Sequence, residues 1–242
     1  MRSTIVSISA AALIIAAGLT PAHARLQLSI SANGSTFTCF DGQLSCDVSG
    51  GANNLLTIDQ TIGGAFAQIT LATSSFGAVN ELTLSSANII NESGAPIDIK
   101  LLASDTGFVP PVSFIKNSAS LTFNDAVGSP ASTEQFWADA AGAQGANPNN
   151  TPGALLATVT GTPLTNPDSF SGSLTKPFDA LAPFSMTEGA SLNLITGGSV
   201  TGFSQNMQSG VVPEPSTWAL MLIGFAALVG LAARRRSTAT AA

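Results

Sequence analysis

Hydrophobic and polar residues alternate with a period of two over most of the chain between residues 26 and 203, which is typical of half-buried β-strands. The alternation is clearest in residues 26–30 (LQLSI) and 36–39 (TFTC), which Asn33-Gly34 separates. An Asn-Gly pair between two alternating runs is the strongest short-range signal of a β-hairpin. We therefore predict a hairpin with its turn at residues 33–34.

Breaks rich in glycine and asparagine divide the other alternating runs into short strands. Gly63-Gly64 separates a run around Ile58 from a run around Ile69. Residues 91–94 (NESG) separate Leu84 from the run that begins at Ile97, which predicts a second hairpin. Short strands with a turn signal every 8–12 residues indicate an all-β fold, specifically an antiparallel β-sandwich or jelly roll.

Three segments depart from this pattern. Residues 132–135 (STEQ) precede Phe136, and this capping-box sequence predicts one short helix. Residues 142–153 are rich in Gly, Asn and Pro, which predicts a surface loop. Residues 204–212 read as a linker, so we place the β domain at residues 25–203.

Residues 1–24 have the organisation of a secretory signal peptide. Arg2 provides a short positive start, an apolar stretch is densest over residues 10–19, and Ala22 and Ala24 form an A-x-A cleavage site. The apolar core of about ten residues is too short to span a bilayer, which needs about 20. We therefore expect the protein to be exported and cleaved after Ala24.

A second apolar segment, residues 218–233, lies near the C-terminus and is 16 residues long. As a helix it would extend about 24 Å, slightly less than the hydrocarbon core of roughly 30 Å. Trp218 begins the segment and three arginines follow it, and both residue types suit membrane interfaces. The segment predicts a transmembrane helix with residues 237–242 as a cytoplasmic tail. The alternative is a buried core helix, against which the adjacent arginines argue.

The segment around this apolar run combines a proline-rich start, a Gly-Phe pair and an arginine cluster. Its characteristic residues are Pro213, Glu214, Pro215, Trp218, Ala219, Gly224, Phe225, Gly230, Arg234, Arg235 and Arg236. Their order, spacing and terminal position resemble the PEP-CTERM sorting signal, in its PEPxxWA variant, over residues 213–236. The resemblance implies recognition by exosortase, a multi-pass membrane enzyme of exopolysaccharide-producing Gram-negative bacteria, and processing near Pro-Glu-Pro. It implies nothing about the task of the exported domain.

The composition excludes several function classes for that domain. Charged residues make up 9% of the chain, against about 25% in ordinary globular proteins. Residues 25–212 carry four basic and 13 acidic residues, a net charge of −9. A surface this acidic cannot neutralise a phosphate backbone, which excludes nucleic-acid binding.

The mature chain also lacks the groups that common catalytic and metal sites need. His23 is the only histidine and leaves with the signal peptide, which excludes Ser-His-Asp and Cys-His mechanisms. Two cysteines are too few for a structural zinc site of three or four Cys/His ligands. We therefore expect no catalytic residues, no metal and no cofactor.

Cys39 and Cys46 are the only cysteines, and both lie in the exported part. A disulfide between them is the default in an oxidising compartment. The rival reading is a reactive thiol, for which the mature chain offers no histidine as a base. Loop closure over about eight residues would contribute at most roughly 2.5 kcal/mol to stability.

Three interpretations compete for the exported domain. The first is a non-catalytic structural protein of the cell surface or biofilm, with exosortase, the inner membrane and an exopolysaccharide as partners. The second is a carbohydrate-binding β-sandwich, although Trp137 is the domain's only Trp and the chain has no Tyr.

The third is a glycan-active enzyme that uses two carboxylates, with Asp105, Asp125, Asp139 and Asp168 as loop candidates. We interpret these four acids as solvated turn residues. Two SxxK sequences, Ser113–Lys116 and Ser173–Lys176, lack the companion motifs of penicillin-binding proteins.

Overall fold

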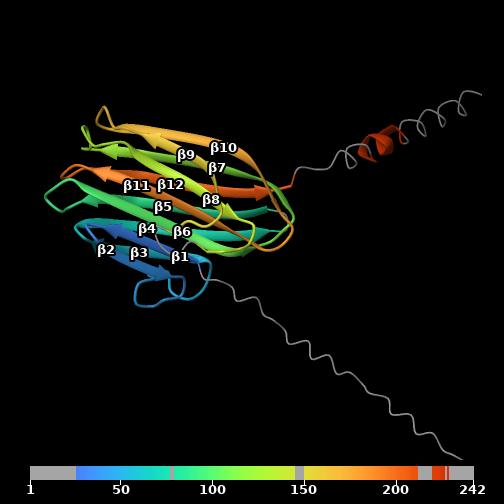
Figure 1. The fold of residues 1–242 in the computed structure, drawn as a ribbon, viewed down its shortest axis with the longest axis horizontal. Coiled ribbons are helices and arrows are strands. Elements are labelled where there is room, and N and C mark those ends of the chain that lie inside the picture. Colours follow the sequence, from blue (N-terminus) through green and yellow to red (C-terminus); the bar gives the residue numbers. More distant parts are fainter. Residues whose placement is uncertain (1–25, 77–78, 145–149, 212–219, 227, 229–242) are drawn as a thin grey trace, which may run out of the picture.

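The computed structural model describes residues 26–76, 79–144, 150–211, 220–226 and 228. Within them, two antiparallel sheets of six strands each pack face to face as a sandwich (Figure 1). The strands are β1 (Gln27–Ala32), β2 (Ser35–Phe40), β3 (Leu55–Ile62), β4 (Ala65–Phe76), β5 (Val79–Asn91), β6 (Ile97–Phe108), β7 (Val112–Asn124), β8 (Ser132–Asp139), β9 (Ala154–Gly161), β10 (Asp168–Ala180), β11 (Phe184–Leu194) and β12 (Ser199–Gly210). The prediction of an all-β, sandwich-like fold is confirmed. The predicted signal peptide, with Ala22 and Ala24, lies outside the described residues.

The two sheets interleave in sequence. The first sheet has the order β2-β1-β6-β11-β8-β9, and the second has the order β10-β7-β12-β5-β4-β3. Only some neighbours in these sheets are also neighbours in the chain, so several connections cross from one sheet to the other. As a result of these crossings, β8 and β11 lie side by side in the first sheet, whereas β12 lies in the second.

The hairpin predicted at Asn33-Gly34 is confirmed, because β1 and β2 pair in the register Ala32↔Ser35. Both turn residues have positive φ, 48° for Asn33 and 74° for Gly34, as a type I′ turn requires. The Asn33 side-chain amide donates a 2.8 Å hydrogen bond to the carbonyl of Gly63 in the β3–β4 turn. This bond ties the tips of two hairpins that belong to different sheets.

The hairpin predicted at residues 91–94 is wrong, because β5 lies in the second sheet and β6 in the first. The amide nitrogen of Asn91 donates to the carbonyls of Ala95, Leu194 and Ile195 at 2.7–3.1 Å. These bonds hold the chain as it crosses between the sheets. Alternation identified the buried residues here correctly but gave no information about which strand each one pairs with.

The short helix predicted from residues 132–135 is also wrong, because these residues begin strand β8. Strand β8 pairs with β11 on one side and with β9 on the other. Its burial alternates, with Ser132, Glu134, Phe136 and Ala138 buried. Glu134, which lies inside the segment that suggested a helix cap, instead points into the core.

The linker predicted at residues 204–212 is wrong as far as residue 210, because β12 continues to Gly210 between β5 and β7. Gln205 is 0% exposed and Ser209 is 2% exposed. These polar residues occupy inward positions that an alternating pattern would fill with apolar ones, which hid the strand. The β domain therefore extends to residue 210.

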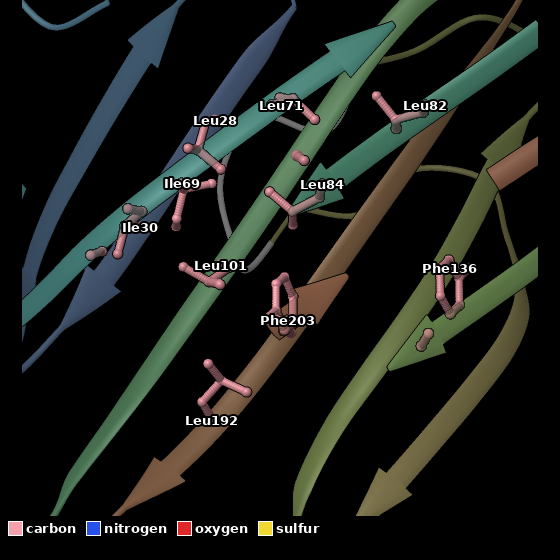
Figure 2. Packing of buried hydrophobic residues seen from close by; sticks show 14 of the residues in the cluster. Leu28, Ile30, Ile69, Leu71, Leu82, Leu84, Leu101, Phe136, Leu192 and Phe203 are labelled. Atoms are coloured by element: carbon pink, nitrogen blue, oxygen red, sulfur yellow. The ribbon is translucent and has the colours of Figure 1, made fainter. Parts of the chain in front are cut away.

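The core lies between the two sheets and is made of aliphatic and phenylalanine side chains. Figure 2 shows side chains from both sheets pointing into this layer: Leu28, Ile30, Leu101, Phe136 and Leu192 from the first sheet, and Ile69, Leu71, Leu82, Leu84 and Phe203 from the second. Burial of one such side chain stabilises the fold by about 1.5–3 kcal/mol. The packed core therefore holds the two sheets, and the side chains on their outer faces, in fixed positions.

The disulfide expected between Cys39 and Cys46 is present, with a Cα–Cα distance of 6.0 Å. It closes the turn after β2, where the Asp47 carboxylate accepts hydrogen bonds from the backbone N–H groups of Gly42 and Thr57. Burial acts to raise the pKa of Asp47, but hydrogen bonds from Ser49, Gly42 and Thr57 outweigh it and lower that pKa. The loop is thus held both covalently and by a buried carboxylate.

Replacing both cysteines by serine is expected to lower the free energy of unfolding by about 2 kcal/mol, because the unfolded chain regains the entropy of an open loop. Urea unfolding of the oxidised protein and of the Cys39→Ser/Cys46→Ser variant measures the change. Wild-type protein unfolded with a reductant present should match the variant. Equal stability of oxidised and reduced wild type would contradict the prediction.

Candidate functional site

A polar face covers the outer side of the first sheet, away from the core. Paired residues form rows across the strands, and one row joins Ser31 of β1, Lys100 of β6, Ser191 of β11 and Thr133 of β8. The side chains of this row are short and polar apart from Lys100. Such a row leaves the sheet surface open to solvent rather than covered by bulky residues.

A shallow hollow of about 190 Å³ lies on this face, beside Trp137 of β8. Gly189 of β11 also lines the hollow, and a Cβ atom at this position would lie 2.9 Å from the Trp137 ring and 3.3 Å from Leu102 Cδ1. The indole therefore lies over the glycine and against Leu102, which is only 2% exposed. The absent side chain at residue 189 is what makes room for the ring, and the ring itself is half-buried.

Hydrogen-bonding groups surround the indole. The hollow is also lined by Gln135, Lys100 and Ser191. The Ser191 hydroxyl donates a 2.9 Å hydrogen bond to Asp98, and the Lys100 ammonium lies 3.9 Å from the same carboxylate. One positive and one negative charge thus offset each other at the rim.

A second polar hollow lies next to the first, on the side of the β1–β2 hairpin. Ser31, Asn33, Gly34, Asp98 and Lys100 line it, so Lys100 belongs to both hollows. The two hollows lie over four adjacent strands, β8, β11, β6 and β1, and we call them together the Trp137 trough. It offers one flat aromatic face followed by hydroxyl, amide, ammonium and carboxylate groups.

A pair of buried carboxyl groups lies on the opposite, inner side of the same two strands. Glu134 of β8 pairs with Ala190, two residues after Glu188 of β11, so the two glutamates are diagonal neighbours. Both are 0% exposed. Their four carboxyl oxygens have no hydrogen-bond partner among the described protein atoms.

Burial raises the pKa of both acids and so favours their protonated forms. It raises the pKa of Glu134 to about 8, although the Gln205 side chain opposes the shift. Burial also raises the pKa of Glu188 well above its ordinary value, helped by the nearby charge of Glu134 and opposed by the backbone of Leu84 and Met207. Neutral carboxyl groups are the form that such an apolar layer tolerates.

Gln205 of β12 connects the two sheets beside these acids. Its amide nitrogen donates a 3.0 Å hydrogen bond to the carbonyl of Gly189, the same glycine that underlies Trp137. Because both carboxyl groups are closed off from solvent, a polysaccharide cannot reach them in this conformation. The pair therefore does not supply the acid and base that a glycoside hydrolase presents to its substrate.

Three of the four aspartates considered as candidates for a two-carboxylate enzyme stabilise turns. The Asp168 carboxylate accepts from Leu164 N–H at 2.8 Å, and the Asp139 carboxylate accepts from Ala141 N–H at 3.0 Å. The Asp125 carboxylate accepts a 2.6 Å bond from the Asn166 side chain. Asp105 differs, since it lies within β6 and is 7% exposed, so its interpretation as a solvated turn residue is wrong.

The two SxxK sequences lie on strands, at Ser113–Lys116 in β7 and Ser173–Lys176 in β10. Residues three apart in a strand point to opposite faces of the sheet. The serine and lysine of each sequence therefore do not converge.

Of the sorting segment, the structure describes only a short part. Gly224 and Phe225 lie in the helical residues 220–226, whereas Pro213, Glu214, Pro215, Trp218, Ala219 and the arginines at 234–236 lie outside the described residues. The apolar side chains of this helical part are all well exposed: Leu220, Met221, Leu222, Ile223 and Phe225. Among the residues described, no helix has both the length and the apolar character to cross a membrane.

The likenesses to solved structures are distant. One is a carbohydrate-binding module, TmCBM61 in complex with β-1,4-galactotriose, at 8% identity and TM-score 0.31 over 57% of this chain and 86% of that one. Another is murine APRIL, at 8% identity and TM-score 0.29 over 59% and 98%. A third is the CBM22-1 xylan-binding domain from Paenibacillus barcinonensis Xyn10C, at 10% identity and TM-score 0.26 over 62% and 87%. Such scores carry no argument about function.

Sequence comparison gives a specific result at the C-terminus alone. No curated protein matches the chain significantly. The family model of the PEP-CTERM protein-sorting motif matches residues 211–236, which confirms the resemblance seen in the Pro-Glu-Pro, Gly-Phe and arginine positions. The chain therefore carries a PEP-CTERM protein-sorting motif at residues 211–236.

Proposed function

We propose that this protein is an exported, non-catalytic structural component of the cell surface or extracellular matrix, which exosortase recognises and processes through residues 213–236. The sorting motif at residues 211–236 is the observation that carries the proposal. The signal peptide expected at residues 1–24 would deliver the β domain across the inner membrane. The C-terminal segment would then hold it there until processing.

The residues of the motif give this role a physical basis. Proline fixes its own φ and disfavours a helical residue before it, so Pro213 and Pro215 favour an extended segment that a protease can bind. Glu214 places one negative charge between them. The helical residues 220–226 expose apolar side chains all round, as suits a helix surrounded by lipid. The arginines at 234–236 suit the cytoplasmic side.

A non-catalytic role is supported by the chemistry of the sandwich. No histidine follows residue 23, and the adjacent carboxyl groups of Glu134 and Glu188 are fully buried. On the outer face of the first sheet, the row that joins Ser31, Lys100, Ser191 and Thr133 presents hydroxyl groups and one ammonium group rather than convergent acids. A stable, polar-coated β-sandwich fits a structural or binding task better than hydrolysis.

Deleting Pro213–Pro215 is expected to block processing, leaving the full-length precursor in the inner membrane. The test expresses the tagged protein in a Gram-negative host that has exosortase and in the same host without the exosortase gene. Immunoblots of membrane and extracellular fractions, with mass spectrometry of the C-terminus, report size and location. The wild-type protein without exosortase should behave like the deletion variant.

Deletion of residues 237–242 is the matched control, because it shortens the same end of the chain without touching the motif. It should leave processing nearly unchanged. Normal processing of the Pro213–Pro215 deletion variant, or of wild type without exosortase, would overturn the proposal.

A further inference from the structure

We infer that the Trp137 trough is a binding site for a neutral polysaccharide chain, with the indole of Trp137 as the platform for one sugar ring. The inference deepens the proposed matrix role and rests on it for the presence of polysaccharide around the protein. It is carried by the juxtaposition of Trp137, Gly189 and a row of polar side chains on the outer face of the first sheet.

The first step is the shape that Gly189 gives the surface. Without a side chain at this position, the Trp137 ring lies over the strand instead of standing out from it. A ring supported from below presents a flat, fixed apolar face. The C–H groups on one side of a pyranose ring make a matching apolar surface, while its hydroxyl groups point sideways. A flat indole with polar neighbours therefore suits a sugar better than a wholly apolar ligand.

The second step is the set of hydrogen-bonding groups at the edge of the ring. Gln135 offers an amide, Ser191 a hydroxyl and Lys100 an ammonium group, all at the rim of the same hollow. Sugar hydroxyl groups both donate and accept, so they can bond to each of these groups. A binding site that combines an apolar surface with a few placed polar groups gives orientation as well as affinity.

The third step is the length of the trough. It crosses four adjacent strands, β8, β11, β6 and β1, which spans about 14 Å at roughly 4.8 Å per strand spacing. That length accommodates consecutive sugar rings, with Asn33 and Ser31 at the end far from Trp137. Two neighbouring hollows on one face of the sheet suit consecutive sugars of a chain better than a free monosaccharide, which would fill only one of them.

The fourth step is charge, which selects a neutral chain. Lys100 is paired with Asp98 at 3.9 Å, so the trough offers no surplus positive charge. The domain between residues 25 and 212 has four basic and 13 acidic residues and repels polyanions at long range. A uronic-acid or phosphate-bearing polymer would therefore bind weakly.

A purely structural role for Trp137 would be to cover Leu102, which faces outward and is 2% exposed. That role explains why an apolar residue lies at position 137. It does not explain a ring that stays partly open to solvent over a hollow with polar residues at its rim. The two roles give different results when a ligand is added.

The test uses the full-length protein in detergent with Trp218→Phe, which leaves Trp137 as its single tryptophan. The probes are hydroxyethyl cellulose, dextran, galactan and galactomannan, with alginate as the anionic comparison. At least one neutral polymer should change the Trp137 fluorescence in a saturable manner and retard the protein in affinity gels. Alginate should have an effect at least tenfold weaker.

Single substitutions test whether the polysaccharide binds at the Trp137 trough. Trp137→Ala should reduce gel retardation at least tenfold, and Gly189→Ala should reduce it by displacing the ring. Leu174→Ala, which removes an exposed apolar side chain from β10 in the other sheet, is the matched control and should bind like wild type. Should Trp137→Ala fail to fold, the fluorescence titration of the Trp218→Phe protein still decides the question.

The inference is overturned if none of the four neutral polymers changes the fluorescence, or if Trp137→Ala and the control bind equally. These measurements are made on purified protein, whereas the sorting test follows processing in cells. Failure of one is therefore distinguishable from failure of the other.

Discussion

The free energy of unfolding is expected to fall as the pH rises from about 4.5 to about 8, the interval between the ordinary pKa of Glu134 and its pKa in the fold. In the folded protein Glu134 keeps its proton throughout most of this interval, whereas in the unfolded chain it loses the proton near pH 4.5. The folded state thus binds more protons, and stability decreases with rising pH by about 1.4 kcal/mol per unit for each such group. Over the whole interval, Glu134 accounts for roughly 5 kcal/mol.

Glu188 adds to the effect in the same direction, because its pKa is also raised, by burial first and by the charge of Glu134 second. Below pH 4.5 the stabilisation from both groups is fully present, since folded and unfolded chains are then equally protonated. As the pH rises through the folded pKa values, that contribution is lost. Ionisation of one glutamate also opposes ionisation of the other, so the second proton leaves at a higher pH.

The measurement is urea unfolding at pH 5, 6, 7, 8 and 9 for wild type, Glu134→Gln, Glu188→Gln and the double variant. Glutamine has the same shape as a protonated glutamate but does not ionise. The double variant should show a flat pH profile, and its stability should exceed that of wild type most clearly at pH 9, the highest pH measured. Glu92→Gln is the control, because this residue is exposed, and its profile should follow wild type. A wild-type profile that is flat between pH 5 and pH 8 would contradict the prediction.

Glu134 also shows where sequence reasoning reached its limit. Residues 132–135 resemble a helix cap, and a glutamate within them is expected at the surface in its charged form. In the fold it is a neutral, buried residue between Ser132 and Phe136 of a central strand. Its environment comes from β11 and β12, which begin at residues 184 and 199, at least 50 positions further along the sequence. Local patterns contain no information about such distant partners.

By contrast, features formed by residues that lie close together in the sequence could be predicted from it. The turn at Asn33-Gly34 follows from the backbone freedom of those two residues, and the Cys39–Cys46 disulfide joins residues only seven apart. The sorting motif is likewise a continuous segment that carries its own signature. These features required no knowledge of sheet order.

The candidate glycan site was not predictable, because it depends on strand pairing. Trp137 alone argued against a carbohydrate-binding domain, since a single aromatic residue seemed too few. The structure places Gly189 and Leu102 beneath its ring and Lys100 beside it. That arrangement needs the order β6-β11-β8, which alternation along one strand cannot give. The positions of Gly189 and Gln135 opposite each other become meaningful only once the register is known.

The C-terminal boundary of the sandwich leads to the second large prediction: a chain that ends after Phe203 should not fold. Residues 204–210 pair with β5 on one side and with β7 on the other. They also bury Gln205 and Met207, both 0% exposed. Removing a methionine side chain from a core costs about 2–5 kcal/mol by itself. Losing half of a central strand as well should exceed the whole stability of a typical domain, about 5–15 kcal/mol.

The comparison uses two chains that both begin at residue 25 and end at Phe203 or at Val211. The longer chain keeps the whole of β12, including the 2.8 Å hydrogen bond from the Asn80 amide to the Ser209 hydroxyl that fastens its end to β5. It should show one cooperative urea transition and dispersed NMR signals. The shorter chain should show neither, and protease should digest it rapidly, because β5 and β7 then face each other across a gap with unpaired backbone groups. Cooperative unfolding of the shorter chain would mean that residues 204–210 are dispensable, as expected of a linker but not of a central strand.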